Sequence, residues 1–276
     1  ILVDEGSQTG GMAEADSRLA EQRARLALEP RIDTLMEHCA VGYYSDHELV
    51  LSECARSDGG AVLLRAGAVV LATGAIEQPA VFRNNDLPGV MLGSAALRLM
   101  RRYAVAPGQR CVVLGANPDA VALALELAAG GVKVAELALL EGTPEMGGRA
   151  IVGSADVQRL LDAGIALRTG IRPVEAHAGA SGGISAVTLA DSRESWRVDC
   201  DALLMSVGWS PAQQLALQAG AQTCYEPAIA QHLHLNMAEQ LDELLHDHRG
   251  VAEVVLGFVA GLVESGFHFA VAADDF

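Results

Sequence analysis

The chain has 276 residues, of which 51% are hydrophobic and 20% charged, a balance typical of a globular protein with a buried core rather than of a disordered one. Its 35 acidic and 19 basic residues give a formal net charge of −16, which argues against a nucleic-acid partner because most of the surface repels polyanions. No run reaches the roughly 18 uncharged apolar residues of a membrane helix, so we expect no membrane span.

The five cysteines are scattered, at positions 39, 54, 111, 200 and 224. No two of them have the C-x-x-C spacing of a redox dithiol or a zinc knuckle. We expect buried free thiols in a reducing compartment, which favours a cytoplasmic protein.

The chain begins with the apolar run Ile1-Leu2-Val3 and the acids Asp4 and Glu5, and Gly10-Gly11 follow shortly after. Such a run ending in a carboxylate is typical of the second strand of a nucleotide-binding β-α-β unit, where the acid binds the ribose. We expect this role for Glu5, with Gly10 and Gly11 letting the backbone pass close to the nucleotide. A solvated acid and an ordinary loop are the alternatives.

The first strand of such a unit and its G-x-G-x-x-G turn are expected about 20 residues before the acid, and no residue precedes Ile1 in this sequence. We therefore expect either a fragment or a unit without the loop that holds a pyrophosphate.

The pattern of apolar and turn residues predicts the next elements. They are a helix over 12–27, a strand around 35–41, short strands over 49–54, 61–65 and 68–72, and a helix over 93–103. The last short strand runs into Thr73-Gly74, where a glycine removes a Cβ at a close approach of backbone and ligand. Both residues are candidate nucleotide contacts, with an ordinary strand-to-loop glycine as the alternative.

A second β-α-β unit is predicted from a strand over 110–114, a helix over 121–129 and a strand over 132–140. Its turn stands where a G-x-G-x-x-G/A sequence is expected. Gly115 supplies the tight turn and Ala120 allows close helix–strand contact, but Asn117 replaces the glycine that admits the pyrophosphate. Asn tolerates positive φ, so the turn can persist without a phosphate site. Glu136, 21 residues beyond Gly115, is our candidate for a ribose contact.

Further along, we expect a helix over 157–163, a strand over 165–168, a hairpin of 184–190 with 196–198, a strand over 201–208 and a buried strand over 251–260. The strand over 201–208 ends on Gly208 as the earlier one ends on Gly74, so the pattern occurs twice. This predicts an α/β fold with two Rossmann-like, three-layer nucleotide-binding domains. The first comprises 1–97 plus 212–276 and lacks its first strand; the second, 98–211, is inserted into it.

No reacting side chain is evident. His232-x-His234 and His246-x-His248 invite a metal interpretation, but the surrounding sequence favours a helix, on which i and i+2 point to different faces. We expect surface histidines and no metal. No Ser-His-Asp grouping or G-x-S-x-G turn is present, and we expect no catalytic residue.

Several segments together resemble one family. Ala72-Thr73-Gly74-Ala75-Ile76-Glu77-Gln78-Pro79 is similar to its A-T-G-A-x-E-x-P strand end, Asn85-Asp86-Leu87-Pro88-Gly89-Val90-Met91 to its N-D-x-P-G-V-M segment, and Val259-Ala260-Gly261 with Gly266-Phe267 to its closing stretch. The family is the α-subunit of heterotetrameric sarcosine oxidase, with relatives in dye-linked proline dehydrogenases, opine oxidases and hydrogen cyanide synthase. All are flavoproteins with two dinucleotide-binding domains.

The resemblance implies an FAD- or NAD-linked oxidoreductase subunit that acts on secondary amines or imino acids within a hetero-oligomer, beside a flavin-bearing catalytic subunit. It implies that FAD, NAD or another adenine nucleotide lies in the first domain against Glu5, Gly10, Gly11, Ala40, Val41, Thr73, Gly74 and Gly261. An NAD(P) site in the second domain would involve Gly115, Asn117, Glu136 and Gly208. The alternative is a catalytically silent scaffold for the flavin-bearing partner. Met12-Ala13 follow Gly11 where disulfide reductases carry a cysteine pair, which argues against disulfide reduction.

Overall fold

The computed structural model describes residues 1–11, 17–55, 59–142, 151–226, 231–234 and 270–273. The chain divides into two compact units. Unit 1 comprises Ile1–Ile76 and Pro211–Phe276, and unit 2 comprises Glu77–Ser210. Unit 2 begins earlier than the predicted boundary at residue 98, because strand β8 (Val90–Leu92) pairs with β14 (Ala202–Ser206) of the same unit.

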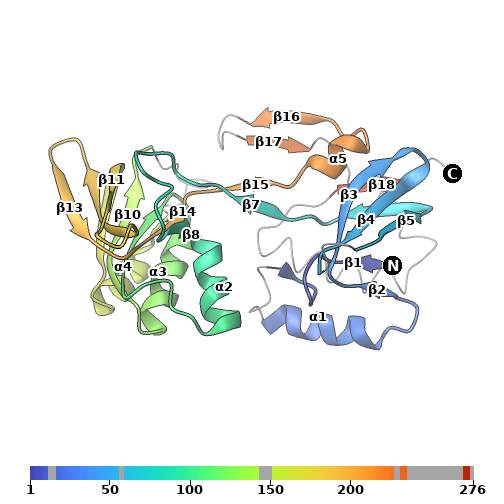
Figure 1. The fold of residues 1–276 in the computed structure, drawn as a ribbon, viewed down its shortest axis with the longest axis horizontal. Helices are drawn as coiled ribbons and strands as arrows, with labels where there is room; N and C mark the ends of the chain where they lie inside the picture. Colours follow the sequence, from blue (N-terminus) through green and yellow to red (C-terminus); the bar gives the residue numbers. More distant parts are fainter. Residues whose placement is uncertain (12–16, 56–58, 143–150, 227–230, 235–269, 274–276) are drawn as a thin grey trace. The chain divides into compact units, whose positions relative to one another are not determined.

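Unit 2 contains a seven-stranded sheet of order β13-β12-β11-β10-β9-β14-β8 (Figure 1). The strands from β8 to β11 are parallel to their neighbours, and β12 and β13 are antiparallel. The further bounds are β9 (Arg110–Gly115), β10 (Lys133–Leu140), β11 (Ala166–Ala178), β12 (Ile184–Ala190), β13 (Ser195–Asp199), α2 (Gly93–Tyr103), α3 (Asp119–Ala129) and α4 (Ser154–Asp162). The parallel pair β9 and β10 joined by α3 forms the predicted β-α-β unit.

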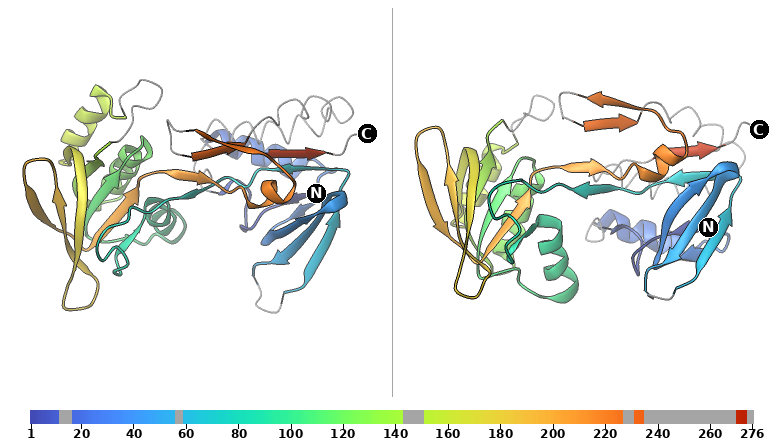
Figure 2. Two further views of the ribbon diagram at one scale, coloured as in Figure 1. Left: turned by 90° about the horizontal axis from the view of Figure 1, so that it is seen from above. Right: turned by 45° about the horizontal axis from the view of Figure 1, so that its top comes forward.

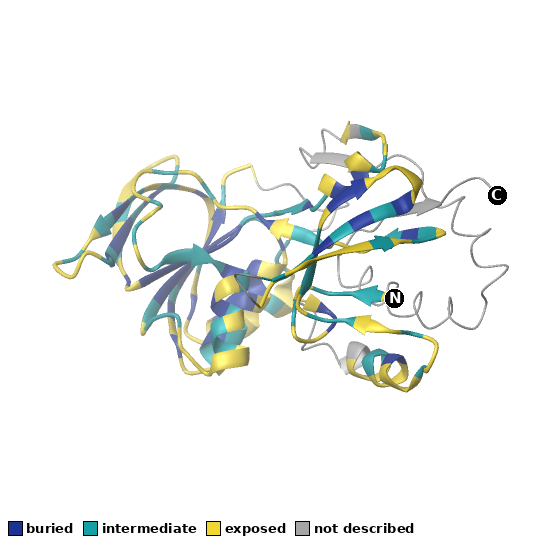
Figure 3. Ribbon diagram, turned by 45° about the vertical axis from the view of Figure 1, so that its right-hand side comes forward, coloured by how far each residue is buried: buried dark blue, intermediate teal, exposed yellow. Residues whose placement is uncertain are grey.

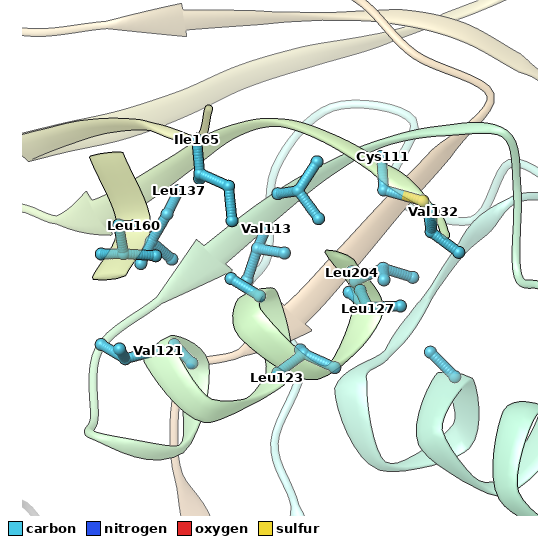
Figure 4. Close-up of a cluster of buried hydrophobic side chains, with 14 of the residues drawn as sticks. Cys111, Val113, Val121, Leu123, Leu127, Val132, Leu137, Leu160, Ile165 and Leu204 are labelled. Carbon is cyan, nitrogen blue, oxygen red and sulfur yellow. The ribbon is translucent and has the colours of Figure 1, made fainter. Parts of the chain in front are cut away.

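Both faces of the central strands are buried. Cys111 and Val113 of β9 face α2, α3 and α4, whereas Val112 and Leu114 face the opposite side. The helix-side cluster consists of Ala96, Cys111, Val113, Ala120, Val121, Leu123, Ala124, Leu127, Val132, Val134, Leu137, Leu139, Leu160, Ile165, Ala202 and Leu204. Figure 4 shows side chains of this cluster between α3 and the strands. Burial on both faces explains why β9 and β14 are continuous apolar runs in the sequence.

The opposite face is covered by strands rather than by helices. The strand-side cluster consists of Val112, Leu114, Ala138, Ile171, Ala176, Ile184, Val187, Leu189, Cys200, Leu203 and Met205. Strands β11, β12 and β13 supply much of this layer, and the sheet curls accordingly (Figure 2). The layers of unit 2 are therefore the helices, the central parallel strands and the curled part of the same sheet.

Strand β11 is much longer than the predicted strand over 165–168. It pairs in parallel with β10 from Ala166 to Ile171 and then antiparallel with β12 from Arg172 to Ala178. The second half contains Pro173 and polar residues, so it carries no strand pattern of its own. Its extension is set by the partner strand, which the local sequence does not reveal.

Unit 1 contains smaller sheets: β3-β4-β5, β1-β2, β6-β18 and β16-β17. The bounds are β1 (Leu2–Val3), α1 (Ser17–Leu28), β2 (Thr34–Leu35), β3 (His38–Tyr44), η2 (Ser45–His47), β4 (Glu48–Glu53), β5 (Ala61–Arg65), β6 (Ala68–Leu71), α5 (Gln214–Gln218), β16 (Thr223–Glu226), β17 (Gln231–His234) and β18 (Ala270–Ala273). Strands β7 (Ala75–Glu77) and β15 (Trp209–Pro211) pair where the chain passes between the units.

The core of unit 1 joins distant parts of the sequence. The unit 1 cluster consists of Tyr43, Leu49, Leu51, Val69, Leu71, Leu215 and Ala216. The amide N–H of Tyr43 donates a 2.7 Å hydrogen bond to Oε1 of Gln218, so α5 is tied to β3. Figure 3 shows buried residues in strands β3 and β4 of this unit. Leu215 and Ala216 of α5 therefore complete a core begun by the first 76 residues.

Two predicted elements of unit 1 differ in the structure. The strand expected around 35–41 is two strands, β2 and β3, separated by Glu37, whose φ of 57° breaks the extended run. The helix expected over 12–27 is described from Ser17 to Leu28, and 12–16 lie outside the described residues. The predicted strand over 251–260 and Gly261 also lie outside them.

Candidate functional site

In unit 1, Glu5 lies in a loop that is tied to the start of β3. The strand β1 ends at Val3, and the N–H of Asp4 donates to the carbonyl of Leu35 at 3.0 Å. The N–H of His38 then donates to the carbonyl of Asp4, and the N–H of Glu37 to that of Gly6, both at 3.0 Å. These bonds hold the loop beside β3 and leave the Glu5 side chain exposed.

The structure brings Glu5 close to the predicted adenine-facing segment. Burial, and then the neighbouring Cys54 and Glu5, raise the pKa of the Cys39 thiol, so the carboxylate of Glu5 lies within electrostatic range of Cys39. Ala40 follows directly and is half-buried, whereas Val41 is exposed. The bond from His38 to Asp4 also places the Glu5 loop beside the start of β3, the strand that contains Ala40 and Val41.

The two glycines after Glu5 adopt conformations that other residues rarely adopt. Gly10 has a φ of 106° and Gly11 a φ of 51°, in the left-handed region that glycine enters without steric cost. The carbonyl of Thr9 accepts a 3.3 Å hydrogen bond from Nη1 of Arg23 in α1. The glycine pair thus turns the chain from the Glu5 loop toward α1.

Thr73 and Gly74 follow β6 and contact the returning segment of unit 1. The hydroxyl of Thr73 donates to the carbonyl of Ala212 at 2.7 Å, and the N–H of Ala212 donates to the carbonyl of Gly74 at 3.0 Å. Gly74 has a φ of 69°. The Thr73 hydroxyl and the Gly74 carbonyl therefore bind the backbone of unit 1 itself, where the chain returns from unit 2. Gly261, the remaining predicted contact of this domain, lies outside the described residues.

In unit 2, the turn between β9 and α3 is packed tightly. A Cβ placed on Gly115 would lie 2.4 Å from the Cβ of Ala120, so only glycine fits at the end of β9. This close approach is the reason that the sequence pattern requires a glycine and a small residue five positions later. The predicted role of Ala120 in close helix–strand contact agrees with this geometry.

Asn117 is buried at the start of α3, with 8% of its surface exposed. Its Oδ1 accepts hydrogen bonds from the N–H of Ala120 and from the hydroxyl of Ser206, each at 3.2 Å. Its Nδ2 has no hydrogen-bond partner among the described residues. The side chain therefore caps the helix from the position where the expected pattern has no side chain at all.

Two acidic side chains that the sequence analysis did not single out lie in the same region. Glu77 is buried, and its Oε2 accepts a 2.8 Å hydrogen bond from the N–H of Ser94 at the start of α2. Burial raises the pKa of Glu77, the bonds from Ser94 oppose this, and the charge of Asp119 raises it further. Oδ2 of Asp119 accepts a 2.9 Å bond from Nε1 of Trp209. Glu77 could have been found as the acid within the A-T-G-A-x-E-x-P segment.

Glu136 does not lie at the carboxyl end of its strand, as the predicted ribose contact requires. It lies in the middle of β10, paired with Val112 of β9 and Ala166 of β11. The side chain is buried, with its Oε2 3.5 Å from Nε of Arg168, whose guanidinium stacks 4.4 Å over the Trp196 ring. Burial raises the pKa of Glu136 and Arg168 opposes this. The spacing of 21 residues between Gly115 and Glu136 suggested a strand end at Glu136, but β10 continues to Leu140.

The other predicted positions are placed as follows. Gly208 follows β14, and its carbonyl accepts a 2.9 Å bond from the N–H of Gln78; a Cβ there would meet open space.

His232 and His234 lie in strand β17 rather than in a helix, and His246 and His248 lie outside the described residues. Within the described ranges no group of acidic, histidine or cysteine side chains could hold a metal ion, and no helix is long and apolar enough to cross a membrane.

The chain is similar to known proteins along most of its length. A family model described as "Pyridine nucleotide-disulphide oxidoreductase" matches residues 6–232. The alpha subunit of sarcosine oxidase from Rhizobium meliloti (strain 1021) is 31% identical over 255 residues, which are 84% of this chain and 24% of that protein. The alpha subunit from Corynebacterium sp. (strain P-1) is 34% identical over 172 residues, 60% of this chain and 17% of that protein. The chain thus spans a quarter or less of these relatives.

Solved structures share the fold. Thioredoxin reductase of T. acidophilum matches with a TM-score of 0.60 and 14% identity over 95% of this chain and 87% of its own. L-proline dehydrogenase from P. horikoshii matches with a TM-score of 0.59 and 21% identity over 86% of this chain and 42% of its own. The predicted resemblance to sarcosine oxidase alpha subunits and their relatives is confirmed, as is the α/β, Rossmann-like fold class.

Proposed function

The chain belongs to the pyridine nucleotide-disulphide oxidoreductase family, and on that premise we propose that it is the nucleotide-binding portion of an oxidoreductase subunit that acts on secondary amines or imino acids. Two relatives support this substrate class, because they are named for sarcosine and L-proline, and both compounds carry a secondary amine. We extend the proposal to a hetero-oligomer with a flavin-bearing catalytic subunit, since the curated relatives are named as subunits.

The proposed nucleotide site is the Glu5 loop of unit 1, and it takes the adenosine part of FAD or NAD. The observation that carries this assignment is the position of Glu5, an exposed carboxylate just after a parallel strand and beside the Cys39–Val41 segment. A carboxylate in that place accepts hydrogen bonds from ribose hydroxyls. Gly10 and Gly11, both at positive φ, keep side chains away from the path of the nucleotide.

The chain's own residues contribute binding and orientation in this proposal. A flavin, when bound, accepts the hydride that leaves the carbon next to the substrate nitrogen. None of the described residues is proposed as a proton donor or acceptor in that step. The amine is oxidised on the partner subunit, which fits the lack of a candidate catalytic side chain in the sequence.

The direct test is Glu5→Ala in the intact protein, with binding of FAD, NAD and ADP-ribose measured by calorimetry. Losing a charge-assisted hydrogen-bond pair is expected to weaken binding by about 1.5–3 kcal/mol. Glu21→Ala is the matched control, because it removes the same charge from the exposed side of α1. Unchanged affinity in Glu5→Ala, or an equal loss in Glu21→Ala, contradicts the assignment of Glu5.

A catalytically silent scaffold is the second candidate function. It is favoured by the internal use of Thr73 and Gly74, whose hydroxyl and carbonyl bind the backbone of Ala212. The flavin absorption spectrum and thermal melting with added FAD or NAD separate the two candidates. A yellow protein, or one whose melting temperature rises with either nucleotide, supports the oxidoreductase subunit, and a colourless protein that is indifferent to both supports the scaffold.

A further inference from the structure

A dinucleotide binds a β-α-β turn through two features of the helix start. The first backbone N–H groups of the helix point at the pyrophosphate, and the positive end of the helix dipole favours its negative charge. The second glycine of the G-x-G-x-x-G pattern has no side chain, which lets the pyrophosphate come close to the backbone. Each feature can be compared with the β9-α3 turn of unit 2.

The position of the second glycine is filled by a buried side chain. Asn117 replaces this glycine, and 92% of its surface is removed from solvent. Its Oδ1 accepts the N–H of Ala120 and the hydroxyl of Ser206. An oxygen of the protein itself therefore uses one of the N–H donors at the start of the helix.

The remaining donors at the helix start are reduced in number. Pro118 has no N–H to offer. The N–H groups of Val121 and Ala122 donate to the carbonyl of Pro118, at 3.1 and 3.4 Å. The N–H of Ala116 donates to the carbonyl of Ser206 at 3.0 Å. The N–H groups of Ala116, Ala120, Val121 and Ala122 are thus bonded to the chain itself.

The charge at the helix start is negative. Asp119 lies in the first turn of α3, where its carboxylate already compensates the helix dipole. The indole Nε1 of Trp209 holds that carboxylate in place at 2.9 Å. Glu77 is buried nearby, within electrostatic range of Asp119. A pyrophosphate brought to this point would meet the carboxylate of Asp119, with the acidic side chain of Glu77 nearby.

We propose that unit 2 does not bind NAD(P) at its β9-α3 turn, and that Asn117, Pro118 and Asp119 have converted a dinucleotide site into an internal helix cap. Unit 2 then supplies packing surface, and any nucleotide held by this chain lies in unit 1. This departs from the expectation of an NAD(P) site involving Gly115, Asn117, Glu136 and Gly208. It does not depend on the proposed function, because it concerns a different unit.

Hydrogen exchange of the full chain, with and without millimolar NAD⁺ or NADP⁺, tests the proposal. We expect no ligand-dependent change in the amides of 116–122. Protection of these amides by either nucleotide overturns the proposal. Peptides covering 1–11 and 34–44 report separately on the unit 1 site. A failure of the proposed function therefore does not affect the interpretation of the 116–122 amides.

Two variants test the physical cause. The double variant Asn117→Gly, Asp119→Ser removes the internal cap and the negative charge. We expect its affinity for NAD⁺ or NADP⁺ to rise at least roughly tenfold, or by about 1.4 kcal/mol. We also expect new exchange protection of the amides of 116–122. Asp119→Asn keeps an acceptor for Trp209 and removes only the charge, and we expect a smaller gain. Asp86→Ser removes a charge from another exposed loop of unit 2 and is expected to gain nothing. Unchanged affinity in both Asp119 variants, or an equal gain in Asp86→Ser, overturns the assignment.

Discussion

The buried carboxylate of Glu77 in unit 2 accepts a hydrogen bond from the backbone. Glu77 accepts the N–H of Ser94, a donor at the start of α2 that lacks a partner within its own helix. The carboxylate also lies at the positive end of the helix dipole. Because burial raises its pKa above the ordinary value of 4.5, the charged form is maintained at a cost to the folded state.

This cost predicts a pH dependence. The raised pKa means that the folded protein holds the Glu77 proton more tightly than the unfolded chain, so this contribution to stability is full below pH 4.5 and is lost as pH rises through the folded pKa. Glu77→Gln keeps an acceptor for Ser94 and removes the titration. We expect the free energy of unfolding of Glu77→Gln, relative to the wild type, to increase across that window in urea titrations at several pH values.

The matched variant is Glu77→Ala, which leaves the N–H of Ser94 buried without its acceptor. It is expected to lose about 1–3 kcal/mol of unfolding free energy. A difference between Glu77→Gln and the wild type that does not vary with pH would contradict the assigned cause.

At the scale of elements, the junction of β9 with α3 is tightly packed. The Cβ atoms of Ala120 and of a substituted Gly115 would lie 2.4 Å apart, and the backbone of β9 cannot move freely because it is paired with both β10 and β14. The glycine that suggested a nucleotide site is therefore required by packing, whether or not a ligand binds.

Gly115→Ala is expected to destabilise unit 2 by about 1–3 kcal/mol, the usual range for overpacking a core. Gly208→Ala is the control, because a Cβ there meets nothing within 4 Å, and a change within about 0.5 kcal/mol is expected. Denaturant unfolding of the two variants measures the difference. Equal stability of the two would show that the helix can shift away from β9.

At the scale of the whole molecule, the two units have separate cores. The helix-side and strand-side clusters are formed entirely by residues between Glu77 and Ser210, whereas the unit 1 cluster combines Tyr43, Leu49, Leu51, Val69 and Leu71 with Leu215 and Ala216. Unit 2 is continuous in sequence, and unit 1 needs two segments that lie more than a hundred residues apart.

This arrangement predicts that a fragment of residues 77–210 folds by itself. We expect cooperative denaturant unfolding of the fragment, with exchange protection of β9 and β14 like that in the full chain. A fragment of residues 1–76 lacks the α5 contribution to its core and is expected to unfold at lower denaturant. Non-cooperative unfolding of 77–210 would contradict the independence of unit 2.

The sequence by itself determined the elements whose pattern is local. Helix α2, strand β5 and strand β12 were predicted with the bounds that the structure has, because turn residues and apolar periodicity mark both ends of each. The glycine at 115 and the small residue at 120 were also predictable, since their spacing reflects one helix start. The family resemblance followed from three short segments, over 72–79, 85–91 and 259–267.

Only the tertiary structure decided the features that depend on distant partners. The length of β11, the burial of Glu136 beside Arg168 and Trp196, and the start of unit 2 at Glu77 all depend on strands or side chains far away in sequence. The same holds for Asn117, whose identity was plain in the sequence but whose bond to Ser206 joins residues 89 positions apart. Local patterns specify conformation, whereas packing between remote segments specifies which face of a strand is buried and whether a helix start is open to a ligand.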